Sequence, residues 1–421
     1  MKKILVLFPN EWDRSELGAA RYAGCYEFLY HGDNLFRFPG TLKLLRFDPL
    51  AFIAQVVSRF GRERIDGVLS TDEYVGALIA AVVARRLGLP GADPEKIALA
   101  QHKFLSRQHQ KQIAPAATPD FTLVPVPARG APLPLEFPFF LKPVKGTYSV
   151  LAARVDSPRA FRDHVDFGPL EKFYLRRVIR PFNDLLEACT DFDLDASYFI
   201  GEELLEGSQV TVDGFAFGGA VETLGVVDSV MFPGTSTFER FEYPSRLPPA
   251  VQARIEELAR RLVRGMGMRD GQFNVELVYE PRRDEIKIVE INPRMSYQFA
   301  DLYEKVDGRN SYDILLDLTI GQKSWFRRGD GRCRCAASFV LRTFQGARVT
   351  KVPSRGQIER FRQRHTGSRV KVYGWAGQSL QAEMKAVGSY RYAVVNAGAG
   401  TRSDLFATYR QAVEHLAFAF A

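Results

Sequence analysis

Cysteine is scarce in this chain of 421 residues, which contains only Cys25, Cys189, Cys333 and Cys335. Cys333 and Cys335 are the one close pair, and neither a CxxC motif nor a matching histidine accompanies them. A structural zinc site is therefore not expected. So few cysteines in so long a chain are typical of a reducing compartment, and we expect a cytoplasmic protein.

Long hydrophobic runs are also missing. A membrane-spanning helix needs about 20 consecutive apolar residues, and no stretch of the sequence approaches that length. The amino-terminal apolar run, ILVLF at 4–8, is too short for a signal peptide, and the acidic residues Glu11 and Asp13 follow it. The sequence therefore predicts neither a signal peptide nor a membrane partner.

Charge of one sign is not concentrated anywhere. Lys and Arg number 57 against 49 Asp and Glu, which gives a net charge of +8, but no block of like charge extends over five residues. So scattered a surplus does not favour a nucleic-acid partner, whereas a local basic site for an anionic small molecule is compatible with it. The hydrophobic fraction of 46% is typical of a globular protein, and the length predicts two or three domains.

The spacing of apolar residues predicts an α/β chain. At the amino terminus, strand-like segments at 4–8 and 64–71 alternate with helical segments at 48–61 and 73–91, which indicates a parallel-sheet unit. No GxGxxG motif follows the first strand, so a dinucleotide site is not supported there. We place the domain boundaries at 1–95, 96–200 and 201–421.

The later regions mix strands and helices, which is typical of an α+β part. A strand, a glycine-containing turn and a second strand are expected over 137–155, followed by a capped helix at 157–165. A long helix is expected at 248–268. The chain beyond 320 has a mixed pattern and ends in a predicted helix at 403–421.

An unusual polar pattern marks the segment FNVELVYEPRRDEIKIVEINPR at 273–294, which predicts two strands joined at PRRD. If the hairpin is centred on Arg283, Glu276 and Glu290 face each other and Asn292 shares their face. Opposed like charges destabilise a sheet, and a bound Mg²⁺ removes that penalty. Arg294, just beyond, suits phosphate or carboxylate. By itself the segment is equally compatible with a solvated hairpin face, and a slip of one residue would separate the two acids.

Two lysines and one turn add to this pattern. Lys142 ends the apolar strand in FFLKPVKG, where its charge suits a phosphate, and Gly146 and Ser149 offer donors beside it. Lys103 is a weaker candidate upstream. The turn IGEELLEG at 200–207 offers apolar walls and free backbone groups for a base. Taken singly, each of these features is as expected of an ordinary protein surface.

The order of these features resembles the ATP-grasp superfamily, in particular its carboxylate–amine (L-amino acid) ligase branch. The resemblance extends over about 65–320, and NVEL…VEINPR is its most specific part. It implies an N-terminal parallel-sheet domain followed by a two-lobed ATP-grasp fold. It also implies residue roles: Glu276, Glu290 and Asn292 as Mg²⁺ ligands, Lys103 and Lys142 on phosphate, Ser149 in the phosphate loop, Glu202, Glu203, Leu204 and Leu205 around adenine, and Arg294 and Lys142 in catalysis.

The chain departs from the family pattern at two places. Gln209 stands where members usually place an acid on the ribose hydroxyls, although glutamine still accepts a hydrogen bond. The loop after Lys142 has one glycine, Gly146, where many relatives have several, which implies a stiffer lid. The segment VVDSVMFPGTSTFERFEYPSR at 226–246, with Arg240 and Arg246, is expected to line the acceptor site.

The resemblance implies ATP-dependent joining of a carboxylate to an amine through an acyl phosphate, with release of ADP and phosphate. It implies ATP and two Mg²⁺ ions, which Mn²⁺ replaces in some members, small-molecule carboxylate and amine substrates including an amino acid, and a homodimer as one possible assembly. Three alternatives remain open: a bicarbonate-activating enzyme of the biotin carboxylase or carbamoyl-phosphate type, a non-catalytic ATP-binding module, and a nucleic-acid binder.

Overall fold

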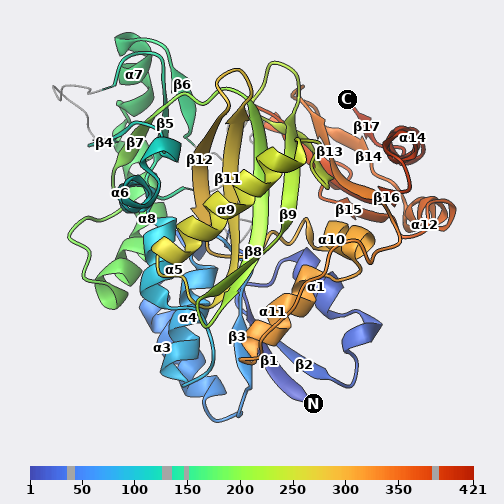
Figure 1. The fold of residues 1–421 in the computed structure, drawn as a ribbon, viewed down its shortest axis with the longest axis horizontal. Coiled ribbons are helices and arrows are strands. Elements are labelled where there is room, and N and C mark those ends of the chain that lie inside the picture. The colour runs from blue at the N-terminus through green and yellow to red at the C-terminus, as the bar shows by residue number, and fades with distance from the viewer. Residues whose placement is uncertain (36–42, 126–134, 147–150, 382–387) are drawn as a thin grey trace.

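The computed structural model describes the whole chain except 36–42, 126–134, 147–150 and 382–387 (Figure 1). Among the described residues, no helix is long and apolar enough to cross a membrane. Three sheets of three, four and eight strands dominate the architecture, and a two-stranded sheet lies near the carboxyl terminus.

The amino-terminal sheet is parallel, with the strand order β2-β1-β3. Its strands are β1 (Lys2–Leu7), β2 (Tyr26–His31) and β3 (Gly67–Leu69). The helices of this region are α1 (Glu11–Leu17), η1 (Ala20–Tyr22), α3 (Pro49–Phe60) and α4 (Gly76–Arg86). The predicted parallel-sheet unit is thus confirmed, with an additional strand, β2, that the apolar pattern did not reveal.

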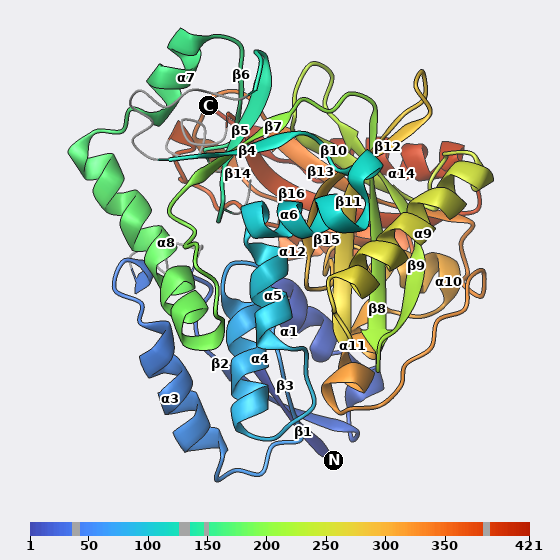
Figure 2. The same ribbon diagram turned by 60° about the vertical axis from the view of Figure 1, so that its left-hand side comes forward.

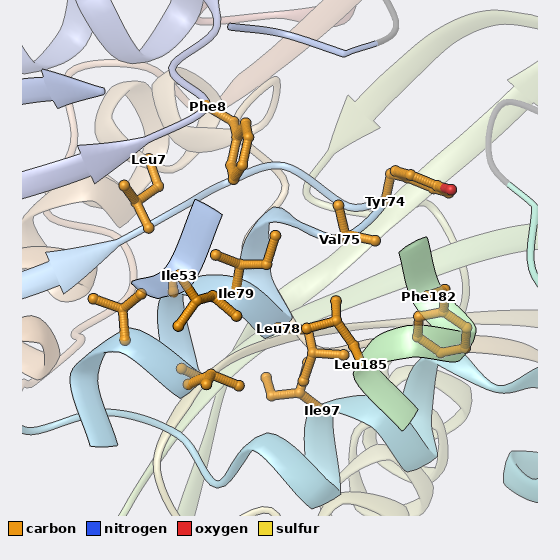
Figure 3. Packing of buried hydrophobic residues seen from close by; sticks show 14 of the residues in the cluster. Leu7, Phe8, Ile53, Tyr74, Val75, Leu78, Ile79, Ile97, Phe182 and Leu185 are labelled. Carbon is orange, nitrogen blue, oxygen red and sulfur yellow. The ribbon is translucent and has the colours of Figure 1, made fainter. Parts of the chain in front are cut away.

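The core of this region includes a helix from much later in the chain. Besides residues of α3 and α4, it contains Ile97 of α5 (Pro94–Gln101) and Phe182 and Leu185 of α8 (Pro169–Cys189). Figure 3 shows Phe182 and Leu185 beside Leu78 and Ile97, and Figure 2 shows α8 running along the same side of the molecule as α3. Because Phe182 and Leu185 are fully buried, α8 is held to the amino-terminal region by apolar packing.

The four-stranded sheet has the order β4-β7-β5-β6. Its strands are β4 (Phe121–Val124), β5 (Phe139–Pro143), β6 (Ala153–Val155) and β7 (Phe199–Glu203), and the adjoining helices are α6 (Lys103–Ile113), η2 (Pro115–Ala117) and α7 (Pro158–Val165). Helix α7 begins as predicted, because the Ser157 hydroxyl accepts a hydrogen bond from the backbone N–H of Ala160 and Pro158 occupies the first turn.

The eight-stranded sheet is antiparallel throughout, with the order β12-β11-β8-β9-β10-β13-β16-β15. Its strands are β8 (Ser208–Phe217), β9 (Ala220–Met231), β10 (Phe238–Tyr243), β11 (Gly271–Glu280), β12 (Glu285–Asn292), β13 (Cys335–Thr343), β15 (Arg369–Val372) and β16 (Tyr390–Ala399). Helix α9 (Pro249–Gly265) crosses one face over β8 and β9 (Figure 1).

The remaining elements complete the large lobe. They are α10 (Ala300–Asp307), α11 (Ser311–Thr319), α12 (Arg355–Arg364), α14 (Arg402–His415) and the strands β14 (Val349–Lys351) and β17 (Ala419–Phe420). The carboxyl-terminal segment adds three strands to the eight-stranded sheet, which the mixed sequence pattern there did not indicate. The predicted fold class, an N-terminal parallel sheet followed by a two-lobed α+β part, is confirmed; the exact domain boundaries stay a prediction.

Candidate active site

The acidic hairpin has the predicted register. Glu276 of β11 and Glu290 of β12 are directly opposed, and Asn274 faces Asn292 two pairs further on. The side-chain amide of Asn292 donates to Asn274 Oδ1 at 3.1 Å and to Glu276 Oε1 at 3.3 Å. A bulge follows Glu276 in the pairing of the two strands. The two carboxylates and the amide therefore share one face at the end of the hairpin next to Arg294.

The two opposed carboxylates have different electrostatic environments. Burial, Glu290 and Glu73 together raise the pKa of Glu276. Burial also favours the protonated form of Glu290, but the charges of Lys103 and Lys142 outweigh it and lower the pKa of that carboxyl. When two carboxyl groups lie side by side, the negative charge of one disfavours ionisation of the other. The opposite pKa shifts of Glu276 and Glu290 follow this rule.

The predicted lysines approach this pair from the smaller lobe. Lys103 Nζ lies 3.5 Å from the Glu290 carboxylate and donates to the backbone carbonyl of Gly146 at 3.1 Å. Lys142 Nζ, at the end of β5, lies 2.7 Å from the Glu202 carboxylate. Both ammonium groups thus lie on the rim of the space that the two hairpin carboxylates face.

Arg107 is a member of this cluster that sequence reasoning missed. Its guanidinium is buried and donates to Glu202 at 2.6 Å, to Gln110 at 2.5 Å and to the backbone carbonyl of Val289 at 2.7 Å. Burial favours protonation of Glu202, but Arg107 and Lys142 outweigh it and lower its pKa. Arg107 lies on a polar helix and no sequence motif surrounds it. Only its contact with the distant Glu202 shows that it belongs to the site.

A cleft of about 870 Å³ joins these groups. Its lining includes almost every predicted nucleotide contact: Lys103, Lys142, Glu202, Glu203, Leu204, Leu205, Gln209, Glu276 and Glu290. Gly207 closes the turn after the leucines with φ near +126°, and a Cβ there would lie 2.3 Å from the carbonyl oxygen of Tyr279. Only glycine fits that close approach to β11.

Among the predicted residues, Asn292 and Arg294 do not line this cleft, and Ser149 cannot be described. The Gln209 amide donates to Glu276 at 2.9 Å, so its donor end faces the acidic hairpin. Asn292 lines a small polar cavity that adjoins the cleft and shares Lys103, Lys142 and Glu290 with it. Ser149, which was predicted to contact phosphate, lies outside the described residues.

Arg294 lines a second cavity, of about 320 Å³, where α4, α11 and β11 meet. Its guanidinium donates to the carboxylate of Glu73, which follows β3 and also lines the cleft. Glu73 was not singled out from the sequence. Its backbone carbonyl accepts from Gln101 at 2.8 Å and from Lys145 at 3.3 Å, so several elements hold this loop in place.

Lys145 is a second missed cation. It is buried, and its ammonium lies 4.6 Å from the centre of the Phe182 ring. Burial, with a smaller contribution from Lys103, lowers the pKa of Lys145 to about 7. Lys145 follows Lys142 by three positions in the sequence KPVK. Residues three apart in a β-strand point to opposite faces, so the sequence gave no reason to expect both lysines to be buried.

The segment expected to line the acceptor site does so in part. Arg246, Phe238 and the stretch from Asp228 to Met231 line the cleft. Arg246 is about half exposed and lies 3.5 Å from Asp228. Arg240 does not contribute: its guanidinium pairs with Glu242 at 2.7 Å and lies over the Phe406 ring on the other side. The expectation for Arg240 was wrong because the bulge between Phe238 and Arg240 shifts the register of β10.

The donor set fits a magnesium ion. Two carboxylates line the cleft and the Asn292 amide lies beside them in the adjoining cavity, while burial and the neighbouring Glu290 raise the pKa of Glu276. Mg²⁺ typically uses one or two carboxylates and completes its shell with phosphate oxygens and water. Among the described residues, no group of three or more His, Cys, Asp or Glu side chains is arranged to hold a metal without such outside ligands.

Comparison with known proteins agrees with this arrangement. A family model described as an ATP-grasp domain matches 135–302. Mouse carnosine synthase 1 is 26% identical over 314 residues, which cover 66% of this chain and 36% of that protein. The carbamoyl phosphate synthase large chain of Rubrobacter xylanophilus is 24% identical over 284 residues, which cover 64% of this chain and 24% of that protein.

A solved structure extends the likeness over the whole chain. The L-amino acid ligase from Bacillus licheniformis superposes with a TM-score of 0.78 at 18% identity, covering 100% of this chain and 99% of that one. The fold and the cleft define a two-lobed protein whose polar site lies between the eight-stranded sheet and the smaller four-stranded sheet. Residues 135–302 thus match an ATP-grasp domain, and the whole chain has the fold of that ligase. The chain spans only about a third or less of the length of the two curated relatives.

Proposed function

We propose that this protein is an ADP-forming ligase that joins a carboxylate to an amine, with an amino acid among its substrates. The observation that carries the proposal is the opposed pair Glu276 and Glu290 in a cleft that Lys103 and Lys142 also line. Two acids and two cations in one cleft suit a magnesium–polyphosphate group. The acids would bind the metal ion, and the lysines would bind the phosphates. The likeness to an L-amino acid ligase supports the choice of substrates.

In the proposed reaction, an oxygen of the substrate carboxylate attacks the γ-phosphorus of ATP and ADP leaves, which gives an acyl phosphate. The amine nitrogen then attacks the acyl carbon, phosphate leaves, and the nitrogen loses a proton. Lys103 and Lys142 would hold phosphate oxygens as point charges. Arg294 would orient and neutralise the acyl-phosphate oxygens, since its planar fork suits a phosphate.

The remaining predicted residues have supporting roles in this proposal. Glu276, Glu290 and Asn292 would hold Mg²⁺, and the ion would supply positive charge that offsets the negative charge of the phosphates. Leu204 and Leu205 would flank adenine, with backbone groups of Glu202 and Glu203 reading its edge, while Gln209 and Ser149 would contact the ribose and the phosphates. The lobe that carries β5 and β6 would close over the site and exclude water, which otherwise hydrolyses an acyl phosphate.

The test is a phosphate-release screen over pairs of amino acids with ATP and Mg²⁺, followed by mass spectrometry of the products. We expect amino-acid-dependent ADP formation and a product whose mass equals the two substrates minus water. ATP turnover that depends on bicarbonate and on no amine would instead support a bicarbonate-activating enzyme, to which the likeness to carbamoyl phosphate synthase also points. ATP binding without cleavage across the panel would contradict the ligase proposal.

A further inference from the structure

A row of three buried polar side chains crosses the eight-stranded sheet beside the proposed metal site. Asn274 of β11 pairs with Asp213 of β8 on one side and with Asn292 of β12 on the other, and all three are buried. Cross-strand neighbours point to the same face of a sheet. The row therefore shares a face with Glu276 and Glu290, which lie two pairs further along the hairpin.

Hydrogen bonds within the row fix the orientation of the Asn274 amide. Its nitrogen donates to Asp213 Oδ1 at 2.6 Å and to Ser296 Oγ at 2.8 Å. An amide nitrogen carries only two hydrogens, so both are used. The oxygen of Asn274 is therefore directed to its other neighbour, Asn292, whose side-chain nitrogen donates to it at 3.1 Å.

The orientation of Asn292 follows from that of Asn274. If the Asn292 amide were turned over, its oxygen would face the oxygen of Asn274, and two acceptors would meet with no hydrogen between them. In the observed orientation the Asn292 nitrogen also donates to Glu276 Oε1 at 3.3 Å. The nitrogen is thus used within the sheet, which leaves the oxygen as the end of the amide that can bind a cation. Asn292 lines the small polar cavity together with Lys103 and Glu290.

Asp213 is the fixed end of the row, because an ionised carboxylate only accepts hydrogen bonds. Burial raises the pKa of Asp213 to about 6, although the hydrogen bond from Asn274 and the charge of Arg294 oppose the shift, so the carboxyl is ionised at neutral pH. The Tyr303 hydroxyl donates to its second oxygen at 3.1 Å. Asn274 therefore meets a firmly held acceptor on the side of β8.

A purely structural role does not require such a row. Burying polar side chains costs free energy that their hydrogen bonds return only in part, and apolar residues of the same shape can fill such positions without loss of stability. What the polar row provides, and an apolar one does not, is a defined direction for the amide at its end.

We propose that Asp213 and Asn274 are positioning residues that direct the side-chain oxygen of Asn292 toward Mg²⁺. The proposal rests on the metal site of the function proposed above and extends it by two residues that do not line the cleft. Asp213 acts through Asn274, and Asn274 acts through Asn292. The Asn274 amide also holds Ser296, two positions after Arg294, so the same row supports the loop of the proposed catalytic arginine.

The first test measures how much Mg²⁺ strengthens nucleotide binding. A non-hydrolysable ATP analogue is titrated into the full chain by calorimetry, once with saturating Mg²⁺ and once with EDTA, and the ratio of the two dissociation constants is the Mg²⁺ effect. Asn274→Leu has a similar shape but offers Asn292 no acceptor. We expect it to reduce the Mg²⁺ effect about tenfold or more, and to leave the dissociation constant in EDTA within about threefold of the wild type.

The matched control for this variant is Gln272→Leu. Gln272 is buried on the same face of β11 and donates to the backbone carbonyl of Ser311 at 3.0 Å rather than to a residue of the metal site. We expect its Mg²⁺ effect to stay within about threefold of the wild type.

A double variant separates orientation from packing. A carboxylate presents an oxygen whichever way it turns, so Asn292→Asp no longer needs the row to choose between two ends. In that background, Asn274→Leu should change the Mg²⁺ effect by less than about threefold. An equal loss in both backgrounds would show that Asn274→Leu acts through packing and would overturn the proposal.

Asp213→Asn tests the far end of the row, and it carries the comparison if Asn274→Leu loses its circular dichroism spectrum. The new amide can donate as well as accept, so Asn274 is no longer held in one orientation. We expect a loss of about three- to tenfold in the Mg²⁺ effect, which Asn292→Asp should remove.

The outcomes separate this proposal from the ligase function. Reduced Mg²⁺ effects in Asn274→Leu and Asp213→Asn support the positioning role even if no pair of amino acids yields ADP. Wild-type Mg²⁺ effects in both variants overturn the positioning role and leave the ligase proposal standing. A wild type whose nucleotide binding does not respond to Mg²⁺ would overturn the positioning role together with the metal site.

Discussion

The guanidinium of Arg294 donates to the carboxylate of Glu73, although 221 residues separate the two in the chain. The ion pair joins the loop after β3, in the amino-terminal region, to the end of the acidic hairpin in the large lobe. Burial disfavours the charge on Arg294, but Glu73 and Glu276 outweigh it and raise its pKa. The position of the proposed catalytic arginine therefore depends on a loop of the amino-terminal region.

Replacing Glu73 by Gln should lower kcat for ADP formation about tenfold or more and change KM for ATP little. The isosteric amide keeps the shape of the loop but loses the charge that orients Arg294, which is proposed to act on the acyl phosphate. Steady-state kinetics at saturating ATP measure the effect. Glu63→Gln, in the exposed turn that follows α3, is the control; a Glu73→Gln enzyme with wild-type kcat would exclude the positioning role.

Replacing Glu290 by Gln should reduce Mg²⁺-dependent ADP formation at least about 100-fold while the fold persists. One carboxylate of the proposed metal pair is lost, and Glu276 alone provides too little charge to hold the ion with the phosphates. Removal of Mg²⁺ by EDTA should abolish turnover by the wild type in the same way. The measurements are ADP release over a Mg²⁺ titration and far-ultraviolet circular dichroism. Full activity of Glu290→Gln would contradict the assignment of the hairpin as a metal site.

Replacing Lys142 by Met should abolish ADP formation and lower the free energy of unfolding by about 1–3 kcal/mol. The cost is moderate because Arg107 still pairs with the buried Glu202 at 2.6 Å. In a double-mutant cycle with Glu202→Gln, we expect a coupling energy of about 1–3 kcal/mol, since the two side chains lie 2.7 Å apart. Urea denaturation of the four proteins provides these values, and additive effects would show that the pair is not coupled.

The stability of the protein should decrease between about pH 4 and pH 6 through Asp13. Burial raises the pKa of this carboxyl from 3.8 to about 6, although hydrogen bonds from Tyr312 and Thr71 oppose the shift. In that window the folded state binds more protons than the unfolded state at this site, so stability falls as the pH rises. The Asp13→Asn side chain does not titrate and serves as the reference. Relative to that variant, the free energy of unfolding of the wild type should fall by on the order of 2–3 kcal/mol from pH 4 to pH 7. A pH-independent difference would exclude this titration.

The acidic hairpin could be read from the sequence because its information is local. The turn PRRD fixes the centre of the hairpin, and the alternation of side chains along a strand then fixes which residues face each other. The structure confirms the pairing of Glu276 with Glu290. The nucleotide contacts in the turn after β7 were predicted differently, from the order of several features along the chain, and they stay a prediction.

The site residues that could not be predicted from the sequence are those whose role depends on a partner far away in the chain. Glu73 and Arg107 lie beside ordinary loop and helix residues, and only the folded chain brings Arg294 to the first and Glu202 to the second. Strand β2, with partly buried residues throughout, shows no alternation to detect.

The packing of α8 against the amino-terminal core has a consequence for synthesis of the protein. Phe182 and Leu185 complete a core whose other members include Leu78 and Ile97. While the ribosome has made only the first sheet and its helices, the apolar surface that these two side chains later cover is still open to water. The amino-terminal region cannot reach its final stability until α8 has left the exit tunnel. Until then it exposes an apolar surface that chaperones would bind.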